Sequence, residues 1–391
     1  SFERRLKSGI ARRSEYHGKG GASETVLKPL IQGDHLTLWL QTEKGFANEE
    51  LQVLRSAERP WKPIGIGANE EGFIAPAGSE CSRTIIKLME EFMQRFSRIS
   101  NPQDRLRFGV ELERPLVQLV LAFARDSLSG LSKAAAKAAG EDKKASWDDF
   151  CGLLMSMEVL NSRLQIWAEL PLYLNMQKLE QSQDKEDSKL KNHSKGFWEK
   201  EKNDLDSLID ECVSGITDAF FDCTKKDLRP WKVSGHKEVS VSQSPPTFAI
   251  AFKNISWRRQ HLSTLLRSSL MWPAIESGVF ARIDNYLVQY AVSNTAFTWN
   301  GLKRLQTECM AIGESLGSGS NLPRTSELIG LSQLSKGKIS SLRAKVEDSS
   351  ITRDQEQMIL REERLGALSP EEVLKMCRKL SSLNCMPTSP R

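Results

Sequence analysis

Apolar side chains recur along this chain at the spacing of an α-helix, and this recurrence limits its fold more than any other feature. One stripe consists of Ile85, Leu88, Met89, Phe92, Met93, Phe96 and Ile99. Further stripes run through residues 106–123, 150–167, 205–223 and 275–290. A half-buried strand would instead place apolar residues at every second position. The pattern therefore predicts an all-α protein made of several helical bundles.

Prolines and capping residues mark the expected helix ends. Asn101, Pro102 and Asp104 supply an N-cap, a first-turn proline and a first-turn acid to the helix that follows them. Pro115 lies inside that helix, where a proline ring clashes with the preceding turn. We therefore expect a kink or a split there.

Other boundaries are predicted by the same signals. Two pairs are typical of capping boxes, namely Ser146 with Asp149 and Ser369 with Glu372. Pro230 is expected to end the helix that contains residues 205–223. The charged stretch 181–195 has no apolar period and predicts a solvated connector.

Glycine and proline clusters divide the chain into three expected parts. The predicted parts are an N-terminal helical segment and loop at 1–76, a central helical bundle at 77–235 and a C-terminal helical bundle at 236–391. A length of 391 residues suits two or three domains. No signal peptide opens the chain. It begins at Ser1 without an initiator methionine, so we expect it to be part of a longer protein.

Charge and cysteine content limit the partners and the compartment. The net charge of +5 is too small for a histone-like partner, although a local basic patch stays possible. The seven cysteines are widely spaced, so we expect free thiols that pack in apolar stripes in a reducing, cytosolic compartment. The longest apolar stretch, 116–124, falls well short of the roughly 20 residues that a membrane span needs.

Motifs for catalysis, cofactors and metals are missing from the sequence. Gly337 and Lys338 lack the upstream glycine of a phosphate-binding loop. Glu70 stands where a dinucleotide-binding pattern that starts at Gly65 and Gly67 would need its third glycine. No cysteine pair has the close spacing of a zinc site. We therefore predict no cofactor, no metal and no enzyme activity.

Two tryptophans allow a binding interpretation. Trp257 precedes Arg258 and Arg259, and together they could stack on a base and contact phosphates. The favoured alternative is an amphipathic helix with a solvated basic face. Trp167 lies on an apolar stripe and is expected in the core.

Four stretches, in a fixed order, resemble a known family. They are Arg95-Phe96-Ser97-Arg98-Ile99 followed by Leu106, Phe108, Leu112 and Leu116; then Leu160, Leu164, Trp167 and Ala168; then Tyr286, Phe297, Asn300, Gly301 and Leu305; and finally Leu365-Gly366 with 368–383. Their order and spacing resemble the RINT/TIP family of vesicle tethers. The family has two adjacent glycines where this chain has Asn300 and Gly301.

The resemblance implies a fold and a function. The fold would be an elongated multi-bundle helical rod of the multisubunit-tethering-complex (CATCHR) type, without the family's N-terminal coiled coil. The chain would be a non-enzymatic subunit of a Dsl-type (NRZ) complex in Golgi-to-endoplasmic-reticulum retrograde transport. Its partners would be Zeste-white-ten-type and Sec-thirty-nine-type subunits and endoplasmic-reticulum SNAREs. It would be cytosolic and peripheral on the cytoplasmic face of that membrane, and Phe297, Asn300, Gly301 and Leu305 would bind a partner.

Two other functions stay open on the sequence. Another helical tether subunit, of the exocyst or Golgi type, would give the same stripes with different partners. A helical nucleic-acid-associated scaffold is motivated by the net charge and by Trp257, Arg258 and Arg259. An enzyme with a dispersed active site has no positive sign.

Overall fold

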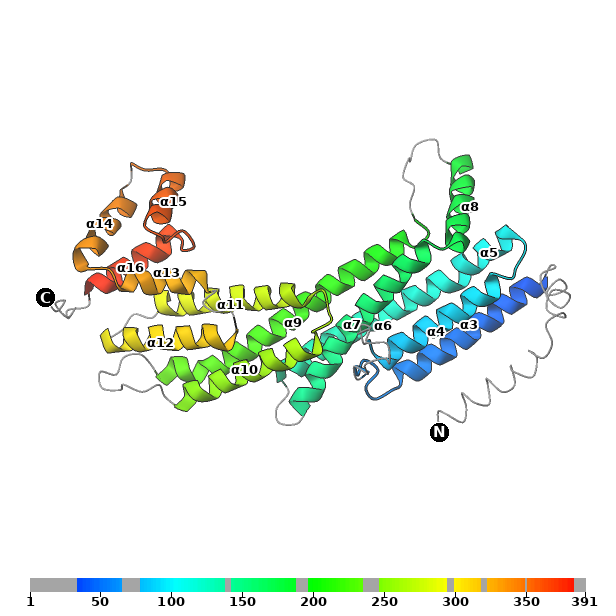
Figure 1. Cartoon of the computed structure of the whole chain (residues 1–391), viewed down its shortest axis with the longest axis horizontal. Coiled ribbons are helices and arrows are strands. Elements are labelled where there is room, and N and C mark those ends of the chain that lie inside the picture. Colours follow the sequence, from blue (N-terminus) through cyan, green and yellow to red (C-terminus); the bar gives the residue numbers. More distant parts are fainter. Residues whose placement is uncertain are drawn as a thin grey trace. The chain divides into compact units, whose positions relative to one another are not determined.

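The protein is all-helical in a computed structural model that describes residues 34–64, 78–137, 142–187, 196–234, 246–293, 299–317, 322–348 and 350–382. Within these ranges it forms α-helices and one π-helical turn, and no strand (Figure 1). The predicted all-α fold class is confirmed.

The described residues fall into two compact units. Unit 1 comprises those within Ser1–Gly65, Ala77–Ser127 and Met155–Ile209, and unit 2 those within Ile66–Pro76, Leu128–Leu154 and Asp210–Arg391. The predicted boundaries at 76/77 and 235/236 stay a prediction.

Unit 1 contains the helices that surround the candidate site. They are α3 (Asp34–Arg55), α4 (Glu80–Phe96), α5 (Pro102–Phe108), the π turn η2 (Gly109–Glu113), α8 (Pro171–Asp187) and parts of α6 (Arg114–Lys137), α7 (Asp142–Ala168) and α9 (Glu199–Ser234). The predicted N-cap of α5 is confirmed, because the Asn101 side chain accepts from the backbone N–H of Gln103 at 3.1 Å.

Aromatic rings fill the core between α3, α4 and α5. The rings of Phe96 and Phe108 lie 4.1 Å apart, and the Trp39 ring meets Phe108 at 4.8 Å in an edge-on arrangement. At the rim of this cluster, Nη1 of Arg95 donates to both carboxylate oxygens of Glu43 at 2.7 Å. The helical stripe that ends in Phe96 and Ile99 is therefore a core stripe, as the sequence predicts.

Unit 2 contains the later helices and the remaining parts of α6, α7 and α9. They are α10 (Pro246–Leu265), α11 (Trp272–Ser293), α12 (Trp299–Ser315), α13 (Pro323–Ser332), α14 (Lys336–Glu347), α15 (Arg353–Glu362) and α16 (Pro370–Ser382). The capping box predicted for the last helix is confirmed, because the backbone N–H of Ser369 donates to Glu372 and the backbone N–H of Glu372 donates to the Ser369 hydroxyl.

Arg324, at the start of α13, links three segments of unit 2. Its Nη2 donates to both carboxylate oxygens of Glu372, at 2.6 and 2.5 Å, and its Nε donates to the carbonyl of Ala367 at 3.1 Å. The backbone N–H groups of Arg324 and Thr325 donate to Asp284 of α11. Asp284 therefore caps α13, while Arg324 ties it to α16.

Replacing Arg324 by methionine should lower the free energy of unfolding by roughly 2–4 kcal/mol, because a largely buried carboxylate would lose its partner. Glu372 would keep only the hydrogen bonds from Ser369. Urea denaturation followed by circular dichroism measures the loss. Arg353→Met makes the same change at an exposed position of α15 and should cost less than about 0.5 kcal/mol, the usual scatter of surface substitutions. Equal effects of the two variants would contradict this role of Arg324.

Three of the predicted boundaries are wrong. Helix α7 begins at Asp142, so Ser146 and Asp149 lie inside it; the alanine- and lysine-rich stretch before them favours helix. Helix α8 continues to Asp187, well into the predicted connector. Helix α9 runs past Pro230 to Ser234, where the fully buried Leu228 holds the preceding turn in the core.

Candidate partner-binding site

The helix that contains Pro115 is interrupted by a π turn, and this turn organises the candidate site. Helix α5 ends at Phe108, and α6 begins at Arg114, next to the proline. The backbone N–H of Arg114 donates to the carbonyl of Gly109, five residues earlier. A wider turn gives room to the proline ring, which in a regular helix meets the carbonyl four residues before it. The predicted break is confirmed and takes this form.

An aromatic cluster fixes the start of α8 against the π turn. The Tyr173 ring lies 5.4 Å from Phe197 and 5.3 Å from Trp198, and the two latter rings meet edge-on at 5.0 Å. All three side chains are buried. Gly109 is required here, because a Cβ atom at this position would lie 2.6 Å from Cζ of Phe197.

Arg114 connects the π turn to the middle of α8. Its Nη1 and Nη2 donate to the two carboxylate oxygens of Glu180 at 2.6 and 2.9 Å. Nη2 also donates to the carbonyl of Phe197 at 2.6 Å, and the guanidinium carbon lies 4.1 Å from the centre of the Phe197 ring. This bidentate, stacked arrangement suits arginine and would not suit lysine.

Glu113, the last residue of the π turn, is fully buried. Its Oε1 accepts a hydrogen bond of 2.9 Å from the Tyr173 hydroxyl, whereas its Oε2 has no hydrogen-bond partner in the described part of the chain. Burial raises the pKa of Glu113 to about 8, against the opposing effect of the Tyr173 hydrogen bond. At neutral pH the side chain is therefore mostly a neutral acid.

Replacing Gly109 by alanine should destabilise unit 1 by about 1–3 kcal/mol, because the new methyl group would overlap Phe197 and press on Met176 at 3.1 Å. Gly45→Ala is the matched control. Gly45 lies inside α3, and a methyl group added there would have no atom within 4 Å, so alanine should stabilise by roughly 0.5–1 kcal/mol. Thermal melts measure both. A Gly109→Ala protein as stable as Gly45→Ala would contradict the required contact.

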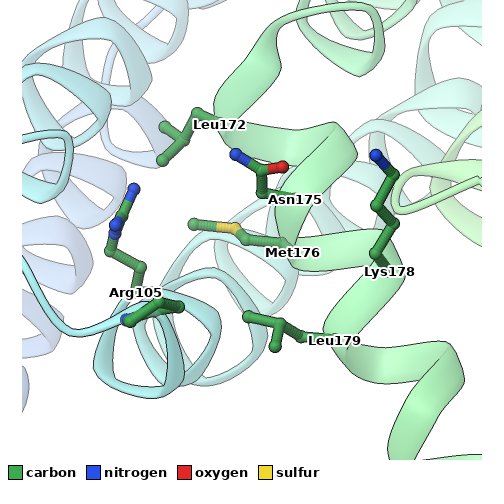
Figure 2. A pocket seen from close by; sticks show the side chains of 7 residues that line it. Arg105, Leu172, Asn175, Met176, Lys178 and Leu179 are labelled. Carbon is green, nitrogen blue, oxygen red and sulfur yellow. The ribbon is translucent and has the colours of Figure 1, made fainter.

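The anchored helix α8 and the start of α5 enclose a pocket of about 250 Å³ (Figure 2). Leu172, Asn175, Met176 and Leu179 line it at helical spacing from one face of α8, with Lys178 at its edge. Pro102 and Arg105 line it from α5. We call these seven residues the α5–α8 pocket.

The α5–α8 pocket combines an apolar floor with a basic rim. Met176 is buried at the floor, with Leu172 and Leu179 half-buried beside it. Figure 2 shows Arg105 and Lys178 on opposite sides of Met176. A small-molecule site is usually about 300–1,000 Å³. The α5–α8 pocket is smaller, and its size suits one or two side chains of a partner protein.

The partner-binding residues predicted from the sequence lie in another place. Phe297 lies outside the described residues, and Asn300 and Gly301 belong to the first turn of α12 rather than to a turn between helices. Leu305, one turn later, is only 3% exposed, and α12 packs against α10 and α13. A role of these residues in partner binding stays a prediction.

The side chains of Trp257, Arg258 and Arg259 make contacts within unit 2. Arg258 is only 2% exposed, and its Nη2 donates to Asp227 at 2.5 Å; Arg259 donates to Glu276 at 3.0 and 3.1 Å. The ring of Trp257 stacks on His261 with a centroid distance of 5.2 Å. The predicted solvated basic face is therefore wrong for Arg258, because Asp227 on α9 binds it in the core. Trp167 is buried, as expected.

The described cysteines pack in the core. Cys81, Cys151, Cys212, Cys223, Cys309 and Cys377 are buried thiols, whereas Cys385 lies outside the described residues. Burial raises the pKa of Cys81 to about 12, and burial, with a smaller effect of Glu211, does the same for Cys212. Thiols with such pKa values are poor nucleophiles near neutral pH. The predicted packing role of these six residues is confirmed.

Two features are absent from the described ranges. No group of three or more His, Cys, Asp or Glu side chains in them could hold a metal ion. No helix in these ranges combines the length and the apolar character needed to cross a bilayer.

The α5–α8 pocket is not predicted from the sequence, although the apolar helical face that forms part of it can be recognised there. Leu172, Met176 and Leu179 follow Pro171 at i, i+4 and i+7 spacing, which indicates one apolar helical face. The contribution of Arg105 has no such signal. It comes from an element more than 60 residues earlier, and only the fold brings the two together.

Comparison with solved structures places the fold in a class. The chain is similar to Tip20, a Dsl1 complex subunit solved with the SNARE Sec20 bound, with a TM-score of 0.62 and 12% sequence identity. The match covers 96% of this chain and 62% of that one, so this chain spans less than two thirds of its length. The fold is thus the all-α, multi-bundle type of tethering-complex (CATCHR) subunits.

The sequence then identifies the family. It matches the model of the RINT-1/TIP-1 family over residues 2–379, and the chain belongs to this family. The resemblance found in the sequence is confirmed. Comparison with curated proteins gives no significant match.

Proposed function

We propose that this chain is a non-enzymatic subunit of a vesicle tethering complex that acts in Golgi-to-endoplasmic-reticulum retrograde transport. Membership of the RINT-1/TIP-1 family along residues 2–379 carries this proposal. The likeness in fold to Tip20, solved with the SNARE Sec20 bound, supports SNARE binding. The chain would join Zeste-white-ten-type and Sec-thirty-nine-type subunits and endoplasmic-reticulum SNAREs, and would be held at the cytoplasmic face of that membrane through them.

Long packed helices suit this function. Helix α9 has 36 residues, and at 1.5 Å per residue it extends for about 54 Å. Such a helix is stiff, because its backbone hydrogen bonds are satisfied internally, and a stiff element can carry binding surfaces without bending. A tether has to span a distance and bind its partners, and helices can do both without a reactive group.

Co-purification tests the proposal. The full chain, expressed with candidate Dsl-type subunits and with endoplasmic-reticulum SNARE cytoplasmic regions, should form a complex that survives gel filtration. Exocyst and Golgi-tether subunits are the control partners and should elute separately. Preference for the control partners would move the chain to another tether. DNA binding that falls steeply with salt, without tether partners, would instead favour the nucleic-acid scaffold.

The start of α12 is a proposed second contact. Phe297, Asn300, Gly301 and Leu305 would form it, with the buried Leu305 holding α12 in place. Phe297→Ala should then weaken binding of a tether subunit without changing the melting temperature. Unchanged binding would remove this contact from the proposal.

A further inference from the structure

We propose that the α5–α8 pocket binds an amphipathic helix of a partner protein, with apolar side chains inserted over Met176 and acidic side chains paired with Arg105 and Lys178. This inference rests on the proposed function, because it supplies one of the partner contacts that a tether subunit needs. It assigns the chemistry of that contact to seven named residues.

The charges of the α5–α8 pocket indicate an acidic partner. Both charged residues that line it, Arg105 and Lys178, are cations. Of the adjacent acids, Glu180 binds Arg114, whereas Asp104 accepts from the neutral amide of Asn101 at 2.8 Å and keeps its charge. The two cations outnumber Asp104, so the rim of the pocket keeps a net positive charge that α5 and the described side chains of α8 leave unbalanced.

The Arg105 guanidinium suits a carboxylate partner. Its Nη2 donates to the carbonyl of Ser100 at 3.1 Å, whereas its Nε is buried and has no hydrogen-bond partner in the described part of the chain. A carboxylate in the α5–α8 pocket would therefore pair with the terminal N–H groups of the guanidinium, in the charge-assisted geometry that arginine favours.

The apolar floor indicates a helix rather than an extended peptide. Leu172, Met176 and Leu179 repeat along about two turns of α8, which matches the side-chain repeat of a second helix lying along it. An extended peptide that binds by strand addition needs a sheet edge, and no strand exists in the described ranges. A helical partner satisfies its own backbone hydrogen bonds, so side chains alone can secure it.

Peptide selection tests the inference. A display library of random peptides about four helical turns long is selected on the full chain and counter-selected on the Arg105→Glu/Lys178→Glu variant. Enrichment of Asp or Glu beside Leu, Met or Phe at helical spacing is expected. Enrichment of basic or uncharged peptides, or no difference between the two proteins, would overturn the inference.

Matched variants assign the binding to the pocket. Each charge reversal should weaken a selected peptide by about tenfold or more, whereas Lys87→Glu, the same change on an exposed position of α4, should leave its affinity unchanged. Leu172→Ala should also weaken it, but Leu174→Ala, which alters a 41%-exposed residue outside the pocket, should not. A peptide in which lysine replaces each acid should bind the Arg105→Glu/Lys178→Glu variant, because the charges of both partners are then reversed. Failure of this exchange would contradict a direct ion pair.

The outcomes separate this inference from the proposed function. If the chain assembles with tether subunits and SNAREs, and the Arg105→Glu/Lys178→Glu variant keeps every partner and every peptide, the pocket inference fails and the function stands. If the chain assembles with none of them, the function fails, and the peptide selection still decides the pocket. A third outcome concerns vesicles rich in anionic phospholipid. If the native chain binds them, the Arg105→Glu/Lys178→Glu variant does not, and no peptide is selected, then the pocket binds lipid and the inference is overturned.

Discussion

Leu208→Asp should severely destabilise unit 1. Leu208 lies on the buried stripe of α9 and is fully inaccessible to solvent. An aspartate there would bury a charge for which the apolar stripe offers no partner, at a cost above about 4 kcal/mol. Domains are stable by about 5–15 kcal/mol, so the loss removes much or all of the margin. Circular dichroism and urea denaturation measure it.

The control for this variant lies on the same helix. Asn203→Asp introduces the same side chain at an exposed position of α9 and should shift the unfolding free energy by less than about 0.5 kcal/mol. A Leu208→Asp protein with the melting curve of Asn203→Asp would show that this stripe does not face a core.

Glu113→Gln should remove a loss of stability that the native chain suffers as pH rises from about 4.5 to about 8. The pKa of Glu113 is raised from 4.5 to about 8 in the folded chain, mainly by burial. Between these values the folded state holds a proton that the unfolded state has released, so stability falls as pH rises. The slope is about 1.4 kcal/mol per pH unit, and the total is about 4–5 kcal/mol. Below 4.5 and above 8 this group adds no slope.

Glutamine resembles the neutral acid and can still accept from the Tyr173 hydroxyl. Burial, and then Glu113, raises the pKa of Tyr173, so this hydroxyl stays a donor throughout the range. Urea denaturation from about pH 5 to pH 9 should therefore show the Gln variant gaining on the native chain as pH rises. Parallel stability curves would mean that Glu113 is ionised, or solvated, in the folded protein.

Glu111→Gln provides the matched control, because Glu111 lies on the same π turn but is exposed at 37% of its side chain. The hydrogen bond from Arg107, opposed by partial burial and supported by Lys44, lowers its pKa. Its charged form is therefore the favoured one in the folded chain. This variant should show no gain on the native chain as pH rises from about 5 to about 8.

The sequence predicts those features of the fold that depend on neighbouring residues. The core stripe up to Phe96, the N-cap at Asn101 and the capping box at Ser369 are all local patterns, and all are confirmed. Family membership is also predicted by the order of such patterns.

Two of the wrong predictions arise where a distant contact outweighs a local signal. Proline is expected to end a helix, yet α9 passes Pro230 while Leu228 and Asp227 are held by the core and by Arg258. The sequence predicts Arg258 at the surface, but the fold places it in the core beside Asp227 of α9, which binds it. The α5–α8 pocket belongs to the same class, because its basic rim joins residues from two helices that the sequence does not connect.

The π turn between α5 and α6 accommodates Pro115. A π turn takes up one residue more than an α-helical turn, because its hydrogen bond spans five residues instead of four. Removing one residue from Gly109–Glu113 would close it to a regular turn, so α6 would keep its phase and Arg114 would still face Glu180. The Pro115 ring would then meet the carbonyl four residues before it. Related chains without a proline at this position should therefore tolerate a one-residue gap in the π turn.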